Sequence, residues 1–358
     1  MDGPLNARLS GQAAVIVAVI VTGAALKWLS VIVSPLLLAM FLAVMVDGLA
    51  RSLRSRLPAM PRGASLGAAM TIFVGLFALF VLITAENAAG FLAQISTYEP
   101  RLNVVIARAA LALHLKPQSI DQIVARFDAG AAIGYAAQSA QGFLTNAALV
   151  LVYLGFLLVS RHAFERKVVR LFPAREGRGE AVQIFLRIRD AMWRYLWIQT
   201  VLGLLIAVAS WVVMAALGLD EALFWAFLIF ALNYIPIIGP VVAIAAPSLF
   251  AVVQFEGLAQ AAVILAALFA ITFLVGNIML PRMQGRGLNI DPMVVLLSLA
   301  FWGALLGLIG MFLSTPLTVL AMVILAQFEG SRWIAVLLSS DGEPRARGGD
   351  FATGAAKV

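Results

Sequence analysis

The sequence predicts an all-α, polytopic integral membrane protein with about seven or eight transmembrane helices. Hydrophobic residues make up 63% of the 358 residues and charged residues 12%, against roughly 45–50% and ~25% in soluble globular domains. The basic residues are also clustered, because 195–280 and 287–331 contain no Lys or Arg. Basic loops between apolar runs are typical of membrane proteins. A nucleic-acid-binding domain would instead carry a basic face, so we expect a lipid bilayer and no nucleic acid as partner.

The first apolar run, 13–46, is 34 residues long and is interrupted by Lys27, Trp28 and Pro35. A spanning helix needs ~20 apolar residues, so we expect two short helices that meet near residues 30–35. The run is longer than the 7–15-residue core of a signal peptide, which indicates a retained anchor. A third helix is expected at 65–85. Together they form an N-terminal transmembrane region, 1–86.

The middle of the chain is more polar. Residues 87–142 carry scattered charges and helix-breaking prolines, which predicts amphipathic helices on the extracytoplasmic side. The region 143–195 combines a fourth span, at 143–159, with a basic helical segment. Residues 161–194 hold nine basic and four acidic residues, and the positive-inside rule places such a segment in the cytoplasm.

The region 196–330 is predicted to be the transport core. It begins with a span at 196–217 and contains an ordinary span at 258–280. Two longer apolar blocks, 222–253 and 293–327, are interrupted by Pro and Gly. We expect each to be a broken hairpin, because hairpins keep the basic loop that follows 280 in the cytoplasm. The alternative of single kinked spans stays open at this stage.

Charge then sets the remaining topology. Four arginines and no acid lie in 51–62, which predicts a cytoplasmic loop there. Residues 331–358 are expected to be a flexible cytoplasmic tail. The positive-inside rule accordingly predicts that both the N- and the C-terminus are cytoplasmic.

The break within 222–253 is the most informative stretch, with the sequence NYIPIIGP at 233–240. Pro236 and Pro240 each lack an amide donor and disfavour helix at the preceding residue. Gly239 permits an unusual backbone turn. Asn233 and Tyr234 supply an amide and a hydroxyl beside carbonyls that have lost helical partners. Broken backbone in a membrane is tolerated against protein or a water-filled cavity, so this break indicates a pathway.

Three stretches resemble the autoinducer-2 exporter (AI-2E) transporter family, in order and in spacing. They are NYIPIIGP at 233–240, NIMLPRMQG at 277–285 and PMVVLLSLAFWGALLGLIGMFLSTP at 292–316. The resemblance covers most of the chain. The family often reads Gly-Gln where this sequence has Ile198 before Gln199, so that position departs from the pattern.

The resemblance implies a bacterial inner-membrane transporter of about seven or eight helices. It implies export of autoinducer-2 in some members and sodium/proton antiport in others. It also implies a homo-oligomer, a pentamer by the family's pattern.

Candidate site residues fall into two groups. The neutral groups expected along a substrate pathway are Asn233, Tyr234, Pro236, Gly239, Pro240, Asn277, Ser298, Thr315 and Pro316. The charged groups considered for coupling or gating are Asp47, Arg282, Arg286 and Asp291. The carboxylates lie near helix ends or in short loops rather than at mid-membrane, which disfavours carboxylate-based antiport.

Three functions are therefore weighed. The first is export of a small polar solute, with autoinducer-2 as the family-based guess. The second is a Na⁺(Li⁺)/H⁺ antiporter, which requires an essential carboxylate, and the third is a non-transporting membrane scaffold. The chain has no nucleophile–base arrangement, P-loop or metal-ligand spacing, and no cysteine. We therefore expect no enzyme activity, no cofactor and no metal.

Overall fold

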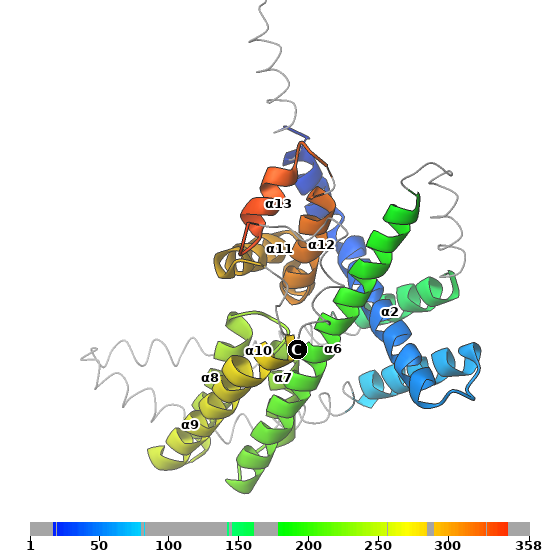
Figure 1. The fold of residues 1–358 in the computed structure, drawn as a ribbon. Coiled ribbons are helices and arrows are strands. Elements are labelled where there is room, and N and C mark those ends of the chain that lie inside the picture. Colours follow the sequence, from blue (N-terminus) through cyan, green and yellow to red (C-terminus); the bar gives the residue numbers. More distant parts are fainter. Residues whose placement is uncertain are drawn as a thin grey trace, which may run out of the picture. The chain divides into compact units, whose positions relative to one another are not determined.

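The structure, a computed structural model, describes residues 17–18, 20–79, 82, 142, 145–160, 178–255, 257–284, 290–326 and 328–342, with the backbone alone for 178–188 and 284. This part of the chain is helical (Figure 1). Five helices are long and apolar enough to cross a membrane: Ser30–Arg56, Arg62–Leu79, Arg189–Ala216, Leu258–Met283 and Pro292–Phe312. Shorter apolar helices are Thr145–Ser160, Ala222–Leu232, Ile238–Gln254 and Ser314–Leu325. The predicted all-α polytopic membrane fold is confirmed.

Some predictions concern residues outside these ranges. They are the amphipathic segment 87–142 except Gly142, the first half of the basic segment, the loop that holds Arg286, and the chain beyond Gly342.

The chain forms two compact units, each assembled from separate stretches of sequence. The first comprises Met1–Ala43, Ala147–Ile188 and Asn289–Val358, and the second comprises Val44–Asn146 and Arg189–Leu288. Helices α2 (Ser30–Arg56) and α6 (Arg178–Ala216) contribute residues to both units.

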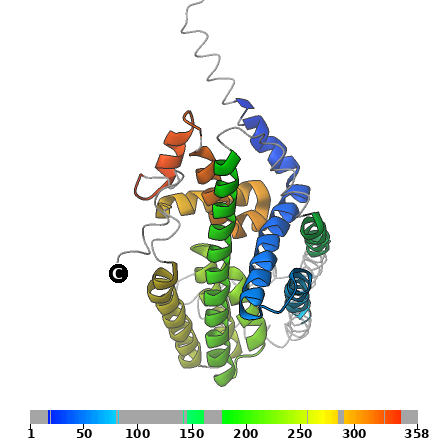
Figure 2. The same cartoon turned by 45° about the vertical axis from the view of Figure 1, so that its right-hand side comes forward.

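The core of the second unit lies among α6, α7 (Ala222–Leu232), α8 (Ile238–Gln254) and α9 (Leu258–Leu274). In both ribbon views α8 and α9 run side by side (Figures 1 and 2). The buried side chains at its centre are Leu202, Ile206 and Met214 of α6, Trp225 and Ile229 of α7, Phe250 and Ala251 of α8, and Ile264 and Leu268 of α9. They are apolar on every helix, as a helix buried on several sides requires.

Helices α7 and α8 form an antiparallel hairpin. Trp225, near the start of α7, contacts Phe250, near the end of α8, with ring centroids 5.3 Å apart. The Gln254 side chain at the end of α8 accepts from the Asp220 amide and donates to the Gly218 carbonyl, both at 2.8 Å. The chain thus returns to the end at which α7 began.

The loop that precedes α7 is fixed by the end of α6. Gly218 has φ +76, the Leu219 amide bonds to the Met214 carbonyl, and the Gly218 amide bonds to Ala215. This is a Schellman motif, which uses glycine because its left-handed conformation carries no Cβ penalty. The sharp stop lets Gln254 reach both sides of the loop.

Helix α9 continues through a π-helical turn, η1 (Val275–Met279), into α10 (Leu280–Gln284). The whole segment Leu258–Met283 is apolar enough to span a membrane. A π-turn within a longer helix is uncommon and often marks a functional position.

The N-terminal apolar run differs from expectation. We expected two short helices that meet near 30–35, but residues 20–28 are helical and α2 follows after the single turn residue Leu29. Helical bonds bridge this point, from the Leu29 amide to the Ala25 carbonyl and from Val33 to Leu29. Pro35 lies inside α2 instead of separating two helices, because loss of one amide bond can kink a helix without ending it.

In the first unit, α11 (Pro292–Phe312) is interrupted at Gly307, whose φ of 67 and ψ of −147 are not helical. The chain folds back there, and residues before and after Gly307 come close together. A Cβ on Gly303 would lie 3.0 Å from Met311, and one on Gly310 would overlap the Trp302 carbonyl. Helix α12 (Ser314–Leu325) follows, and the Trp302 indole donates to Thr318 at 3.0 Å.

The prediction of a flexible tail from residue 331 is wrong for its first part. Residues Arg332–Leu338 form helix α13, which buries Ala335 completely. The Ser331 hydroxyl bonds to the Leu325 carbonyl, and Ile290 pairs with Ser339 in an antiparallel bridge. The apolar residues of α13 were overlooked because they form less than two helical turns.

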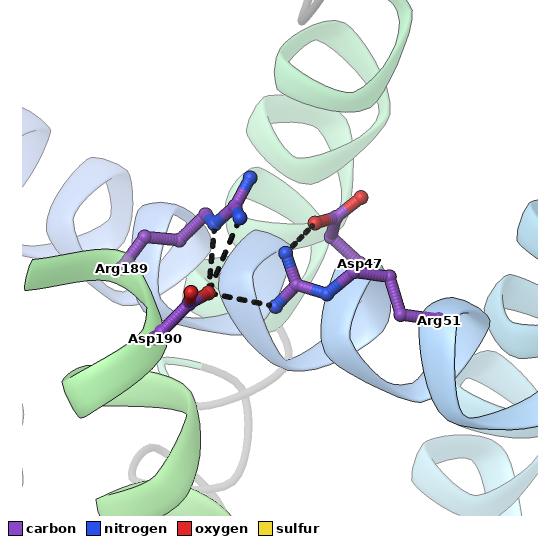
Figure 3. Close-up of polar contacts among 4 residues, drawn as sticks. All are labelled: Asp47, Arg51, Arg189 and Asp190. Carbon is purple, nitrogen blue, oxygen red and sulfur yellow. Dashed lines mark hydrogen bonds and ion pairs between the residues drawn. The ribbon is translucent and has the colours of Figure 1, made fainter. Parts of the chain in front are cut away.

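Helices α2 and α6 approach closely at Gly48. A Cβ on Gly48 would overlap the ring of Trp193, which itself stacks on Trp197 at 5.4 Å. Beside this contact, the guanidinium of Arg51 lies 3.1 Å from Asp47 and 3.4 Å from Asp190 (Figure 3). A second guanidinium, that of Arg189, contacts the same Asp190 oxygen at 3.2 Å.

This contact predicts that Gly48→Ala destabilises the protein by about 1–3 kcal/mol, the usual cost of overpacking. Thermal unfolding of the purified protein measures it. The matched control is Gly67→Ala, because a Cβ at Gly67 meets nothing within 4 Å and alanine favours helix. Equal stability of the two variants would contradict the close approach of α2 to Trp193.

Candidate functional site

The break between α7 and α8 contains a strained turn. The Ile238 amide bonds to the Pro236 carbonyl at 2.6 Å, and Ile237 between them has φ 65 and ψ −58. This is a γ-turn of the rare, positive-φ kind. A β-branched residue with positive φ is an outlier, and such conformations cost of order 1–3 kcal/mol and cluster at functional sites.

The two residues that follow, Gly239 and Pro240, lie in the first turn of α8. Gly239 is required by space, because a Cβ there would overlap the Leu232 carbonyl. The expectation that Pro240 keeps Gly239 out of a helix is wrong, since both are helical residues of α8. Pro240 lies in the first turn, where an amide has no helical partner to lose. The break itself therefore covers residues 233–237.

Two amides link the break to α6. The Gln199 side chain donates to the Asn233 carbonyl at 2.5 Å, and the Asn233 side chain donates to the Gln199 carbonyl at 3.4 Å. Gly203, one turn further along α6, makes room for this pair, because a Cβ there would lie 2.8 Å from the side-chain nitrogen of Asn233. The Asn233 carbonyl freed at the end of α7 thus receives a partner from another helix.

A hydroxyl pair lies beside the amides. The Thr200 hydroxyl is 2.7 Å from the Tyr234 hydroxyl and 2.7 Å from the Leu196 carbonyl. A carbonyl can only accept, so Thr200 donates to Leu196 and accepts from Tyr234. The Tyr234 ring also meets Phe230 edge-on, with centroids 5.7 Å apart. Gln199, Thr200, Asn233 and Tyr234 form what we call the amide–hydroxyl cluster.

The amide–hydroxyl cluster is half-buried and contains no ionisable carboxylate or cation. Neutral donors and acceptors of this kind can exchange a protein partner for a hydroxyl or carbonyl of a small polar molecule. Sequence reasoning found Asn233 and Tyr234, noted Gln199 only as a position that departs from the family pattern, and missed Thr200. The signal was available, because two adjacent polar residues interrupt an otherwise apolar stretch of α6.

The other neutral candidates do not join this cluster in the second unit. Asn277 lies in η1, is exposed, and bonds to the Phe273 carbonyl of its own helix at 3.0 Å. Ser298, Thr315 and Pro316 are buried in the first unit. There Ser298 bonds to the Val295 carbonyl of its own helix at 2.8 Å, a common role for Ser in helices.

Comparison with known proteins gives the family. The model of the AI-2E family transporters matches residues 16–330. The chain belongs to the AI-2E transporter family. It is 33% identical to the AI-2 transport protein TqsA of Escherichia coli over 324 residues, which cover 88% of this chain and 91% of that protein.

Other bacterial proteins are also similar. A Haemophilus influenzae protein with the general name of a transport protein is 27% identical over 336 residues, or 90% of this chain and 94% of its own. The E. coli protein YhhT is 39% identical over 153 residues, which cover 43% of each chain. Membership makes this chain a multi-pass membrane transporter, and it confirms the family predicted from the three sequence stretches.

The two carboxylate candidates of this AI-2E member have structural partners. Asp291 caps α11 by accepting from the Met293 amide at 2.7 Å, and Asp47 pairs with Arg51 (Figure 3). Arg282 lies exposed in α10, and Arg286 falls outside the described residues. Within the described ranges no three His, Asp or Glu side chains gather as a metal site requires.

One carboxylate beside the hairpin has an altered pKa. Partial burial, and then the nearby charge of Asp220, raises the pKa of Glu221 above its ordinary value. Glu221 precedes α7 with φ 54, at the base of the hairpin rather than at its break.

The strained turn predicts that Ile237→Gly leaves stability unchanged or raises it by up to ~1 kcal/mol, because glycine adopts positive φ without the Cβ penalty. Ile238→Gly is the matched control, since both side chains are 47% exposed and Ile238 is helical. It should lower stability by up to ~1 kcal/mol. Melting temperatures that fall equally in both variants would refute the strain.

The hydroxyl pair predicts a measurable coupling between Thr200 and Tyr234. In a double-mutant cycle of Thr200→Val and Tyr234→Phe, we expect a coupling free energy of about 0.5–1.5 kcal/mol, the net worth of one hydrogen bond. Reversible unfolding in mixed detergent measures it. Additive effects of the two substitutions would show that the bond contributes nothing to stability.

Proposed function

We propose that this AI-2E family transporter exports a small, uncharged polar solute across the bacterial inner membrane, and that autoinducer-2 is the first solute to test. The observation that carries the proposal is the amide–hydroxyl cluster at the break of the α7–α8 hairpin. Its donors and acceptors are neutral, which suits a polyol better than an ion. The similar E. coli protein TqsA is named an AI-2 transport protein.

The hairpin break is proposed to line the solute pathway. Unwound backbone between helices is where transporters commonly place substrate sites. The Asn233 carbonyl and the Tyr234 hydroxyl both have protein partners on α6. A solute hydroxyl both donates and accepts, so it could donate to the Asn233 carbonyl and accept from the freed Gln199 amide. Neither group would then be left unsatisfied, which keeps the cost of binding low.

The Na⁺(Li⁺)/H⁺ antiporter remains the second candidate. It requires a titratable group on the pathway, usually a carboxylate. The described carboxylates Asp47 and Asp291 have an ion-pair and a helix-capping role, which supports the neutral solute instead. The scaffold hypothesis predicts no flux at all, and the transporter relatives argue against it. The same relatives support a transporter rather than an enzyme.

The remaining proposals concern placement. The basic segments support cytoplasmic N- and C-termini and an extracytoplasmic 87–142. We propose that 196–330 is the transport core, with hairpins 222–253 and 293–327, that 1–86 and 143–195 surround it, and that 331–358 is cytoplasmic. We also propose that the protein is a homo-oligomer, a pentamer by family resemblance. Its partners would be the lipid bilayer and the solute.

Flux measurements test the function. Proteoliposomes of the purified protein are loaded with autoinducer-2, and its release is followed with and without a proton or sodium gradient. Wild type should give saturable release. Asn233→Leu should reduce the rate about tenfold, because a lost hydrogen bond of ~1.4 kcal/mol in the transport transition state has that effect.

Asn146→Leu is the matched control, because its amide bonds to the Gly142 carbonyl four residues earlier and belongs to no cluster. Its flux should equal wild type. Equal losses in Asn146→Leu and Asn233→Leu would remove the hairpin break from the pathway. Absence of autoinducer-2 flux, together with Na⁺- or Li⁺-driven proton movement, would establish the antiporter instead.

A further inference from the structure

The second helix break, at Gly307 in the first unit, lies beside the one charged residue of a long apolar stretch. Lys27 is the only charged residue between Arg8 and Asp47. Its ammonium lies 2.6 Å from the Ala304 carbonyl of α11. The Ser34 hydroxyl, two turns further along the same run, donates to the Leu306 carbonyl at 3.2 Å.

The break explains why these carbonyls need partners. Gly307 has non-helical φ and ψ, so the helix formed by residues 292–306 ends there. The last four carbonyls of a helix have no partner within it. They also carry the negative end of the helix dipole, which favours a cation by about 0.3–1 kcal/mol and more where it is shielded from water. Ala304 and Leu306 both lie within that last turn.

The chemistry of this end suits a cation better than a neutral donor. Freed carbonyls and half-helix C-terminal ends coordinate Na⁺ in broken-helix transporters. Here the ammonium of Lys27, an exposed side chain just before α2, occupies that position. Lysine also provides a compact, strongly hydrated point charge.

We propose that the carbonyl of Ala304, with the other carbonyls freed at the end of residues 292–306, forms a monovalent-cation site, and that the Lys27 ammonium is its resident cation. Lys27 thereby substitutes for a bound alkali ion at the Gly307 break. Wild-type protein consequently binds no Na⁺ there, and removal of the ammonium opens the site to Na⁺ or Li⁺. The proposal concerns ion binding and holds whichever solute the protein transports.

Direct binding of radioactive Na⁺ to the full-length protein in nanodiscs tests this, with choline as the inert cation. We expect no saturable binding to wild type or to Lys27→Arg, which keeps a cation in place. Lys27→Met should gain saturable Na⁺ binding, and its melting temperature should be lower in choline and recover in Na⁺. Arg54→Met is the matched control, because it removes one positive charge from the C-terminal end of α2 and should gain no binding.

Each alternative result overturns the proposal. Saturable Na⁺ binding to wild type that persists unchanged in Lys27→Met would show that Lys27 does not fill the site. A folded Lys27→Met that binds no Na⁺ would show that the carbonyls are not a cation site. Equal binding to Lys27→Met and Arg54→Met would attribute it to net charge. None of these readouts uses autoinducer-2, so they are independent of the transport test.

Discussion

The structure depends on one constraint, that backbone groups freed by a broken helix inside a membrane must find partners within the protein. No water is available in the hydrocarbon core to satisfy them. Both breaks meet the constraint in the same way, with side chains from a different helix. Gln199 of α6 serves the Asn233 carbonyl, and Lys27 and Ser34 serve Ala304 and Leu306. Each break is therefore tied to a particular neighbouring helix, and the position of that neighbour follows from the hydrogen-bond requirement.

Close packing is the second requirement, because lipid is as apolar as leucine and gives helices little hydrophobic reason to associate. Glycines meet this need at the points of contact. Gly48 accommodates the Trp193 ring, Gly203 accommodates the Asn233 amide, and Gly239 lies against the Leu232 carbonyl. At Gly203 the close approach also permits a polar bond, because a Cβ there would lie 2.8 Å from the Asn233 side-chain nitrogen that donates to the Gln199 carbonyl.

Sequence reasoning predicted the fold class, the apolar helices and the location of the first break, because hydropathy, prolines and glycines act over short ranges along the chain. It could not predict partners across the chain. Gln199 and Asn233 are 34 residues apart and Lys27 and Ala304 are 277 residues apart, and no local pattern encodes such pairings. It also misjudged Pro240, which has the same residue type as Pro236 but begins a helix, and α13, which is too short to show a period. For the second break, sequence reasoning could not tell which of Gly303, Gly307 and Gly310 interrupts the helix, because the three glycines are close in sequence and of one residue type. The structure shows that Gly307 is the one with positive φ.

The two breaks differ in the kind of ligand that each can accept. At the first, a neutral amide and a neutral hydroxyl bond to neutral groups, so another neutral molecule can replace a partner without moving charge into the membrane. At the second, an ammonium meets the Ala304 carbonyl at the negative end of a helix, and only another cation can replace it without leaving that end uncompensated. Under the two proposals, the first break would accept a neutral ligand and the second a cation. Lys27 would then supply, as part of the protein, the positive charge that a bound ion would otherwise bring to Gly307.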